Sequence, residues 1–263
     1  MKHFELIEIK EQPNGATYIW LNRPELHNAF NAQLIAELSQ CFDALEQNVN
    51  TRVVILAGRG KNFSAGADLN WMKAARHFSS EENQQDAMKL ATMLHKLAHL
   101  RQPTIARVHG AALGGGLGLA SACDICIASE KAMFATSEVR LGLAPSTISP
   151  YVIRAIGARQ ASRYFLTAER LSAQQAKAIG LAHEVYSAEA LDTGIQQIIE
   201  QLLLGSPQAQ TASKQLIDTV AEQELTAELM QQTAAHIARL RLGEEAQEGL
   251  SAFLEKRTPH WCA

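Results

Sequence analysis

Two loops of small residues and one glutamate are the parts of this sequence best suited to chemistry. The first loop, residues 63–69, follows an apolar run, and the second, residues 110–118, holds five of the 16 glycines. Small residues ahead of a helix leave backbone N–H groups exposed, where they can bind an anion or a polarised oxygen. The two loops therefore predict an amide-lined site, although each alone is equally consistent with tight packing of a helix on a sheet.

Glu138 is the acidic residue of interest in the mostly apolar segment 134–145. Burial raises the pKa of a carboxyl group, so a half-buried glutamate can accept and donate protons near neutral pH. The alternative is a surface carboxylate paired with Arg140.

Other glycine motifs match this sequence poorly. No lysine follows the glycines as a Walker A loop requires, and no G-x-S-x-G nucleophile elbow occurs. Residues 116–121 approach a dinucleotide-binding fingerprint but end in Ser121 and begin too late after the strand. Because Glu138 follows about 20 positions later, a dinucleotide site remains a weaker alternative.

Composition restricts the remaining classes. The 263 residues carry a net charge of -3, which provides no basic field for nucleic acid or an anionic membrane. No apolar run reaches the roughly 20 residues of a membrane span, and the first residues lack an apolar signal core. Four cysteines are too few for a disulfide scaffold, and Cys123 and Cys126 lack the second pair that a zinc ribbon needs. We expect a cytoplasmic protein with reduced, structural thiols and no metal.

Strand-like and helix-like segments alternate over the first two thirds of the chain, which predicts an α/β fold with a mostly parallel sheet. Ligands bind at the carboxyl ends of such strands, where both loops lie. The last third is helical and is expected to pack on the core or on another subunit. Strands are predicted at residues 4–9, 16–21, 53–57, 104–108, 124–128 and 181–185, and helices at 31–47, 81–100, 115–122, 192–204, 209–220, 227–238 and 244–255.

Five motifs in this order resemble the enoyl-CoA hydratase/isomerase (crotonase) superfamily over nearly the whole chain. The resemblance implies a crotonase (ClpP-like) ββα-repeat core over residues 1–195 and a C-terminal helical trimerisation region over residues 196–263. It also implies a homotrimer or dimer of trimers and an acyl-CoA substrate, with coenzyme A entering as part of that substrate rather than as a cofactor. The motifs are Leu21-Asn22-Arg23-Pro24, Asn28-Ala29-Phe30 and residues 63–69, 110–124 and 138–145.

The resemblance also implies roles for individual residues. It places the two oxyanion-hole amides at Ala67 and Gly115 and the proton-transferring carboxylate at Glu138. Arg23 and Lys61, together with Lys256, are candidates to receive the CoA phosphates. Further substrate or CoA contacts are implied at Ala65, Asp68, Leu69, Gly118, Ser137 and Lys256, with Phe253 a tail position that reaches CoA in some relatives.

The sequence departs from the family at one position. Typical hydratases of this family have two glutamates, and Gly118 stands where the first would be. Single-carboxylate members include isomerases and some hydratases. Residues 116–124 and 144–150 resemble bacterial 3-methylglutaconyl-CoA and isohexenylglutaconyl-CoA hydratases, whose substrates carry a second carboxylate that Arg140 or the turn at 146–149 could bind. We therefore predict hydration of a branched enoyl-CoA, in leucine or terpenoid breakdown. The alternatives are an enoyl-CoA isomerase, a short-chain hydratase of fatty-acid oxidation and an inactive CoA-binding protein.

Overall fold

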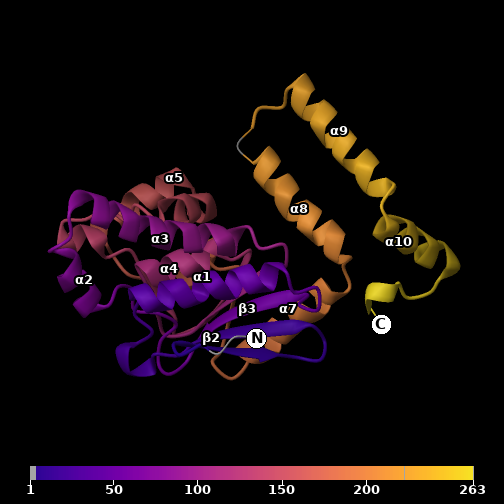
Figure 1. Cartoon of the computed structure of the whole chain (residues 1–263). Helices are drawn as coiled ribbons and strands as arrows, with labels where there is room; N and C mark the ends of the chain where they lie inside the picture. The colour runs from indigo at the N-terminus through magenta and orange to yellow at the C-terminus, as the bar shows by residue number, and fades with distance from the viewer. Residues whose placement is uncertain (1–3, 222, 263) are drawn as a thin grey trace.

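An α/β core and a helical arm make up the chain (Figure 1). The computed structural model describes residues 4–221 and 223–262. Within these ranges, no helix is both long enough and apolar enough to cross a membrane.

The core is built on a six-stranded sheet in the order β1-β2-β3-β4-β6-β9. β1 and β2 form an antiparallel pair, and the other neighbouring strands are parallel, as the sequence pattern predicts. A second sheet has the order β5-β7-β8. The strands are β1 (Ile7–Glu11), β2 (Ala16–Leu21), β3 (Val53–Gly58), β4 (Thr104–Val108), β5 (Ala111–Leu113), β6 (Ile125–Ser129), β7 (Met133–Ala135), β8 (Leu171–Ser172) and β9 (Glu184–Tyr186).

Helices cover both faces of the large sheet. One face packs against α1, α3 and α4, and the other packs against α7. The helices are α1 (Ala32–Glu46), α2 (Leu69–Ala75), α3 (Ser80–Ala98), α4 (Gly115–Ala122), α5 (Ser149–Thr167), α6 (Ala173–Ala178), α7 (Leu191–Leu203), α8 (Pro207–Val220), α9 (Ala227–Arg241) and α10 (Glu244–Glu255). Short 3₁₀ turns cover Pro24–Leu26, Glu138–Leu141 and His260–Cys262.

Several predicted boundaries are confirmed because local signals set them. The side chain of Asn31 accepts a hydrogen bond from the Leu34 amide at 2.8 Å and so starts α1. All six residues of β3 are buried, as expected for a strand covered on both faces. By contrast, the sequence pattern predicts no helix at α5, because Gly157 interrupts it. In the structure α5 is kinked at this glycine, whose φ is 73°.

The core extends past the predicted boundary at residue 195. That boundary falls inside α7, whose residues Leu191, Ile195 and Ile199 are buried against Val53 and Ile55 of β3. This apolar face completes the second side of the sheet, so α7 belongs with the core. The arm begins only at α8.

The cysteine pair lies inside the core. Cys123 and Cys126 are free thiols and are buried, as the sequence predicted. Burial raises the pKa of Cys126 to about 12 and that of Cys123 well above its usual value, so both thiols stay protonated.

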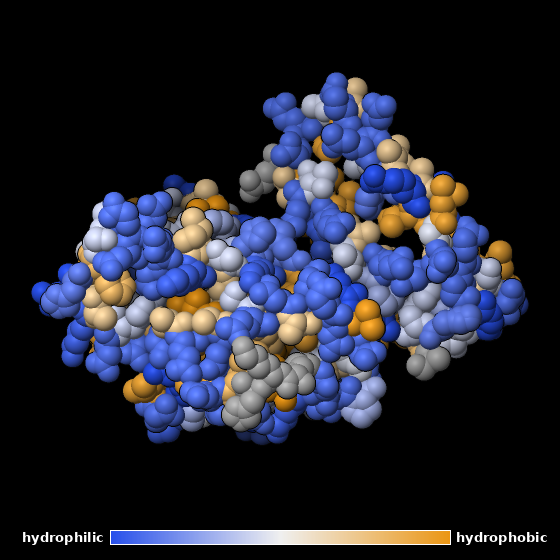
Figure 2. Space-filling view, in the orientation of Figure 1, coloured by the Kyte–Doolittle hydropathy of each residue, from blue (hydrophilic) through white to orange (hydrophobic). Residues whose placement is uncertain are grey.

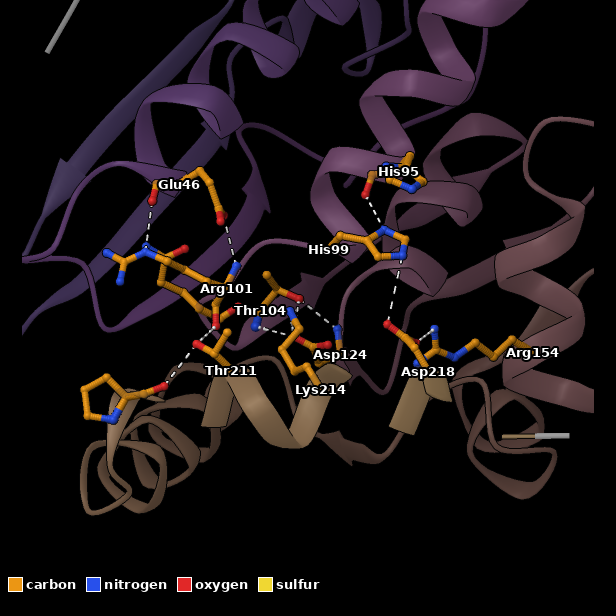
Figure 3. A network of polar contacts seen from close by, with 12 residues as sticks. Glu46, His95, His99, Arg101, Thr104, Asp124, Arg154, Thr211, Lys214 and Asp218 are labelled. Atoms are coloured by element: carbon orange, nitrogen blue, oxygen red, sulfur yellow. Dashed lines mark hydrogen bonds and ion pairs between the residues drawn. The ribbon is translucent and has the colours of Figure 1, made fainter. Parts of the chain in front are cut away.

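Polar contacts fasten the first helix of the arm to the core (Figure 3). Lys214 of α8 lies 2.7 Å from Asp124 Oδ2, which also accepts bonds from the amide and hydroxyl of Thr104. Nearby, Thr211 donates to the Arg101 carbonyl at 2.9 Å, and Asp218 pairs with Arg154 at 2.8 Å. Because the Lys214 side chain is only 15% exposed, this pair is the best shielded of the ion pairs in Figure 3.

The rest of the arm exposes apolar side chains. α9 buries none of its residues, and α8, α9 and α10 border a groove of about 1030 Å³. Figure 2 shows apolar residues gathered around this part of the arm. The large apolar residues exposed here are Leu225, Met230, Ile237, Leu242, Leu250, Phe253 and Leu254.

We predict that Lys214→Ala destabilises the attachment of α8 by about 1–3 kcal/mol, because it leaves the half-buried Asp124 carboxylate without its cation. The matched control is Lys177→Ala, which removes an exposed pair with Glu184 and should cost less than about 1 kcal/mol. Urea unfolding and limited proteolysis of the arm measure the difference. Equal effects of the two variants would contradict the proposed anchoring.

Candidate active site

The first predicted loop is held against Phe30 by its backbone. The Phe30 amide donates to the Gly66 carbonyl at 2.7 Å, and the Asp68 amide donates to the Phe30 carbonyl at 2.8 Å. These two bonds flank Ala67 in a parallel bridge with Phe30. The N–H of Ala67 itself therefore points to the opposite side, away from Phe30.

The second predicted loop is joined to the first by a similar bridge. Ser64 pairs with Ala112 of β5. The Ser64 amide donates to the Ala111 carbonyl, and the Leu113 amide donates to the Ser64 carbonyl. α4 then begins at Gly115, and no side chain caps this end. The first N–H groups of α4 are thus left for a ligand, with the positive end of the helix dipole behind them.

Close approach of the two loops depends on glycine. Gly66 and Gly114 have φ values of 91° and 48°, a region that favours glycine. A Cβ on Gly66 would lie 3.0 Å from the Leu113 carbonyl, and one on Gly114 would lie 3.9 Å from the Gly66 Cα. The loops that carry Ala67 and Gly115 are therefore in contact, as the sequence hypothesis requires.

The Phe30 ring supports the second loop as its backbone supports the first. Phe30 is 1% exposed, and a Cβ on Gly115 would lie only 2.7 Å from its Cε2 atom. Any larger residue at position 115 would displace the ring. One buried residue thus contacts both amide-bearing loops.

Glu138 lies beside this pair of loops. It begins the 3₁₀ turn Glu138–Leu141, and its Oε1 would be 3.1 Å from a Cβ on Gly114. Its Oε2 is buried and has no hydrogen-bond partner among the described residues. Burial raises the pKa of Glu138, a rise that the backbone amides of Glu138 and Ser137 reduce. The alternative of an exposed carboxylate paired with Arg140 is therefore wrong.

Gly118 is a packing position. It is buried in the first turns of α4, and a Cβ there would lie 2.3 Å from Cγ2 of Ile148 and 3.7 Å from Leu94 Cδ1. Ile148 is itself only 2% exposed. The space beside position 118 is therefore filled by an apolar side chain, with no second carboxylate there.

Two other predicted residues border the site with exposed surface. Leu69 opens α2 and is 72% exposed, and Ser137 is exposed beside Glu138. Ala65 is partly buried, and its amide donates to the His27 carbonyl at 2.9 Å.

The side chains of two further predicted ligand residues, Asp68 and Arg23, face inward. The Asp68 carboxylate binds Arg23 and accepts hydrogen bonds from the Asn70 and Trp71 amides at the start of α2. Asp68 therefore acts as the cap of α2. The Arg23 guanidinium is buried with it and does not face a phosphate.

The tail residues lie elsewhere in this protomer. Lys256 follows α10 with a φ of 56°, and Phe253 is 80% exposed. In Figure 1, α10 and α2 occupy opposite ends of the molecule. One protomer alone does not bring Lys256 to Glu138.

The structure adds residues that the sequence did not single out for the site. Phe30 belonged to a recognised motif, but its contacts join residues far apart in the chain. Ile148 lacked any signal of its own, since only the folded chain brings it onto Gly118. Trp71 has a buried indole N–H without a partner among the described residues.

A metal site is not found in the described part of the chain. No group of three or more His, Cys, Asp or Glu side chains lies there in a position to hold a metal ion.

Comparison with known proteins identifies the family of this chain. Residues 11–263 match the family model described as Enoyl-CoA hydratase/isomerase. An enoyl-CoA hydratase structure from Shewanella pealeana has a TM-score of 0.95 and 42% identity, covering 98% of this chain and 96% of that one. The 2,3-dehydroadipyl-CoA hydratase of Escherichia coli is 34% identical, covering 97% of both chains.

The relatives include an isomerase as well as hydratases. A peroxisomal Delta(3,5)-Delta(2,4)-dienoyl-CoA isomerase of Arabidopsis thaliana is 30% identical, covering 99% of this chain and 98% of that protein. The chain therefore belongs to the enoyl-CoA hydratase/isomerase superfamily, has its crotonase fold and is an enzyme of the enoyl-CoA hydratase type.

Proposed function

We propose that this enzyme reversibly hydrates a branched enoyl-CoA, with Glu138 as its acid and base and the Ala67 and Gly115 amides as its oxyanion hole. The observation that supports this most directly is the buried Oε2 of Glu138 beside the two amide-bearing loops, which has no hydrogen-bond partner in the part of the chain that the structure describes. A thioester oxygen between the amides would place the reacting carbons against that carboxylate.

Hydration would proceed with one carboxylate as follows. The Glu138 carboxylate takes a proton from water as the water oxygen bonds to C3, and the C2–C3 electron pair moves toward the thioester oxygen. The two amides stabilise the resulting enolate, at about 2.7–4 kcal/mol per donor in comparable sites. Glu138 then returns the proton to C2, which restores the carboxylate.

Isomerisation is the second candidate, and the packing of Ile148 on Gly118 favours it. With no second carboxylate at position 118, one group must serve every proton transfer. In a 3-enoyl-CoA the Glu138 carboxylate would remove a proton from C2 and return it to C4. The double bond would thereby shift from C3–C4 to C2–C3. The same oxyanion hole would stabilise the dienolate.

A second carboxylate on the acyl chain is supported by one relative and one residue. The E. coli relative is named for 2,3-dehydroadipyl-CoA, a thioester of a dicarboxylic acid. Arg140 is exposed in the same 3₁₀ turn as Glu138. The hydroxyls of Ser146 and Ser149 instead donate to carbonyls of their own turn, so Arg140 is the better candidate. We infer 3-methylglutaconyl-CoA or a related branched enoyl-CoA, from leucine or terpenoid breakdown, as substrate.

The arm supports assembly into a trimer or a dimer of trimers. Its exposed apolar residues form a surface that a second copy could cover. In such an assembly Lys256 and Phe253 would reach the CoA of a neighbouring protomer. The free cysteines among the described residues fit our proposal of a reducing, cytoplasmic location.

We predict that Glu138→Gln lowers kcat by roughly 10²–10⁴-fold, the usual contribution of acid–base catalysis, because the amide cannot carry the proton. Binding of acyl-CoA should persist, since the oxyanion loops are unchanged. Steady-state kinetics and calorimetric titration measure the two effects. A variant with near-wild-type turnover would exclude this role for Glu138.

The Glu138→Gln variant should also be more stable than the wild type. A loss of activity in a more stable protein cannot be explained by a loss of folding. The folded-state pKa of Glu138 is raised, so stability falls as pH rises from the usual glutamate pKa toward the folded value. Glu138→Gln removes that penalty, so its Tm should exceed the wild-type value at pH 7–8 and match it below roughly pH 4. A lower Tm at pH 8 would contradict the unpaired burial of this carboxylate.

The pH dependence of kcat/KM should also report the titration of Glu138. Each reaction direction starts from the carboxylate, so kcat/KM should fall as pH drops through the raised pKa of Glu138. The acid limb should therefore lie above the ordinary glutamate value of about 4.3. A profile without an acid limb above that value would argue against Glu138 as the base.

Substrate comparison should identify the acyl group and the reaction. We expect 3-methylglutaconyl-CoA to give a higher kcat/KM than crotonyl-CoA or 3-methylcrotonyl-CoA, and Arg140→Gln to remove roughly tenfold of that preference by raising KM for the dicarboxylate alone. Arg159→Gln, at an exposed arginine of α5, is the control. Double-bond migration in a 3-enoyl-CoA without addition of water would support the isomerase instead.

A further inference from the structure

We propose that Arg23 polarises and positions the Ala67 amide through two peptide groups in series, with Asp68 holding the guanidinium in place. The inference rests on the proposed function, because it concerns the oxyanion hole of that reaction. It makes Arg23 a positioning residue rather than a ligand of CoA phosphate.

The first link joins Arg23 to the peptide group between Ala29 and Phe30. Nη1 of Arg23 donates to the Ala29 carbonyl at 2.5 Å, and the Arg23 amide donates to Oδ1 of Asn28 at 2.8 Å. A charged donor makes a stronger bond than a neutral one and polarises the peptide that accepts it. The N–H at the other end of this peptide belongs to Phe30.

The second link joins that peptide to the one that carries the Ala67 N–H. The Phe30 amide donates to the Gly66 carbonyl at 2.7 Å. The carbonyl of Gly66 and the N–H of Ala67 belong to one peptide group and point in opposite directions. The guanidinium, two aligned peptides and the proposed oxyanion therefore form one hydrogen-bonded chain, in which each bond strengthens the next.

Asp68 fixes the near end of this chain. Its Oδ2 lies 3.0 Å from Nη2 of Arg23, and both side chains are 9% exposed. Its amide bonds to the Phe30 carbonyl, and its Oδ1 accepts the Asn70 amide at 2.8 Å. Burial alone would raise the pKa of Asp68, but the bonds from the Asn70 amide and Arg23 lower it, so the carboxylate stays charged.

Asp68 also controls the start of α2. None of the residues of α2 is fully buried, so its first turn is attached by the capping bonds to Asp68 together with the packing of the partly buried Trp71 on the core. The pair thus sets both the direction of the Ala67 amide and the position of the helix that follows it.

Substitution of Arg23 provides the test, with a chromophoric acyl-CoA as a probe. A dimethylaminocinnamoyl-CoA absorbs at longer wavelength when its carbonyl oxygen is polarised, so the shift on binding reports the strength of the oxyanion hole without turnover. We expect Arg23→Gln to reduce this shift and to lower kcat by roughly tenfold, part of the effect of losing one donor, with KM within about twofold. Arg23→Lys should recover part of both because it keeps the charge.

Two further variants make the result unambiguous. Arg23→Gln/Asp68→Asn removes the buried unpaired charge, so it should fold well even where Arg23→Gln does not, and it should still lack the full shift. Arg59→Gln breaks a more exposed pair with Glu8 and should leave both readouts at wild-type values.

The outcomes separate this inference from the proposed function. A wild-type shift and kcat in Arg23→Gln or in the folded double variant would overturn the inference while leaving the reaction intact. A wild-type enzyme that shifts the probe but converts no enoyl-CoA in the panel would overturn the proposed function, and a reduced shift in Arg23→Gln would still support the relay.

Discussion

Contact between two separate loops, which carry the Ala67 and Gly115 amides, is the constraint on which the proposed site depends. Ala67 follows β3 and Gly115 follows β4 and β5, so neither loop positions the other through local sequence. Phe30 joins them, because its backbone bonds flank Ala67 and its ring packs under Gly115. The sheet, the glycines and the start of α4 all serve to bring the two loops together.

Glu138, the proposed proton-transfer group, is notable for a hydrogen bond that it lacks. Glu138 is partly buried, yet its buried Oε2 receives no hydrogen bond from the described residues, and such an unpaired carboxylate costs stability. The same burial raises the pKa of Glu138 above the ordinary glutamate value. Packing of Ile148 on Gly118 leaves the neighbouring position apolar, so the proposed reaction relies on the single carboxylate of Glu138.

Local signals explain which parts of this molecule were predictable. The Asn31 cap, the apolar run of β3 and the glycine-led start of α4 each set an element by itself, and the ordered motifs indicated the family and the Glu138 position. Strands of two or three residues such as β8 are too short for any periodicity to show.

Long-range contacts explain what the sequence could not reveal. The inward direction of Arg23 follows from its pairing with Asp68, a residue 45 positions away. The position of Ile148 against Gly118 depends on how α5 packs over α4. The sequence therefore suggested that Arg23 binds a ligand, whereas in the structure its guanidinium forms a buried pair with Asp68.

The contact between Gly118 and Ile148 also restricts how this enzyme can evolve. Adding a glutamate at position 118 alone would drive its Cβ into Ile148 at 2.3 Å, and shrinking Ile148 alone would leave a cavity in the core. Each single substitution is harmful before the second arrives. One-carboxylate and two-carboxylate descendants of this scaffold are thus separated by a fitness valley that only a paired change can cross.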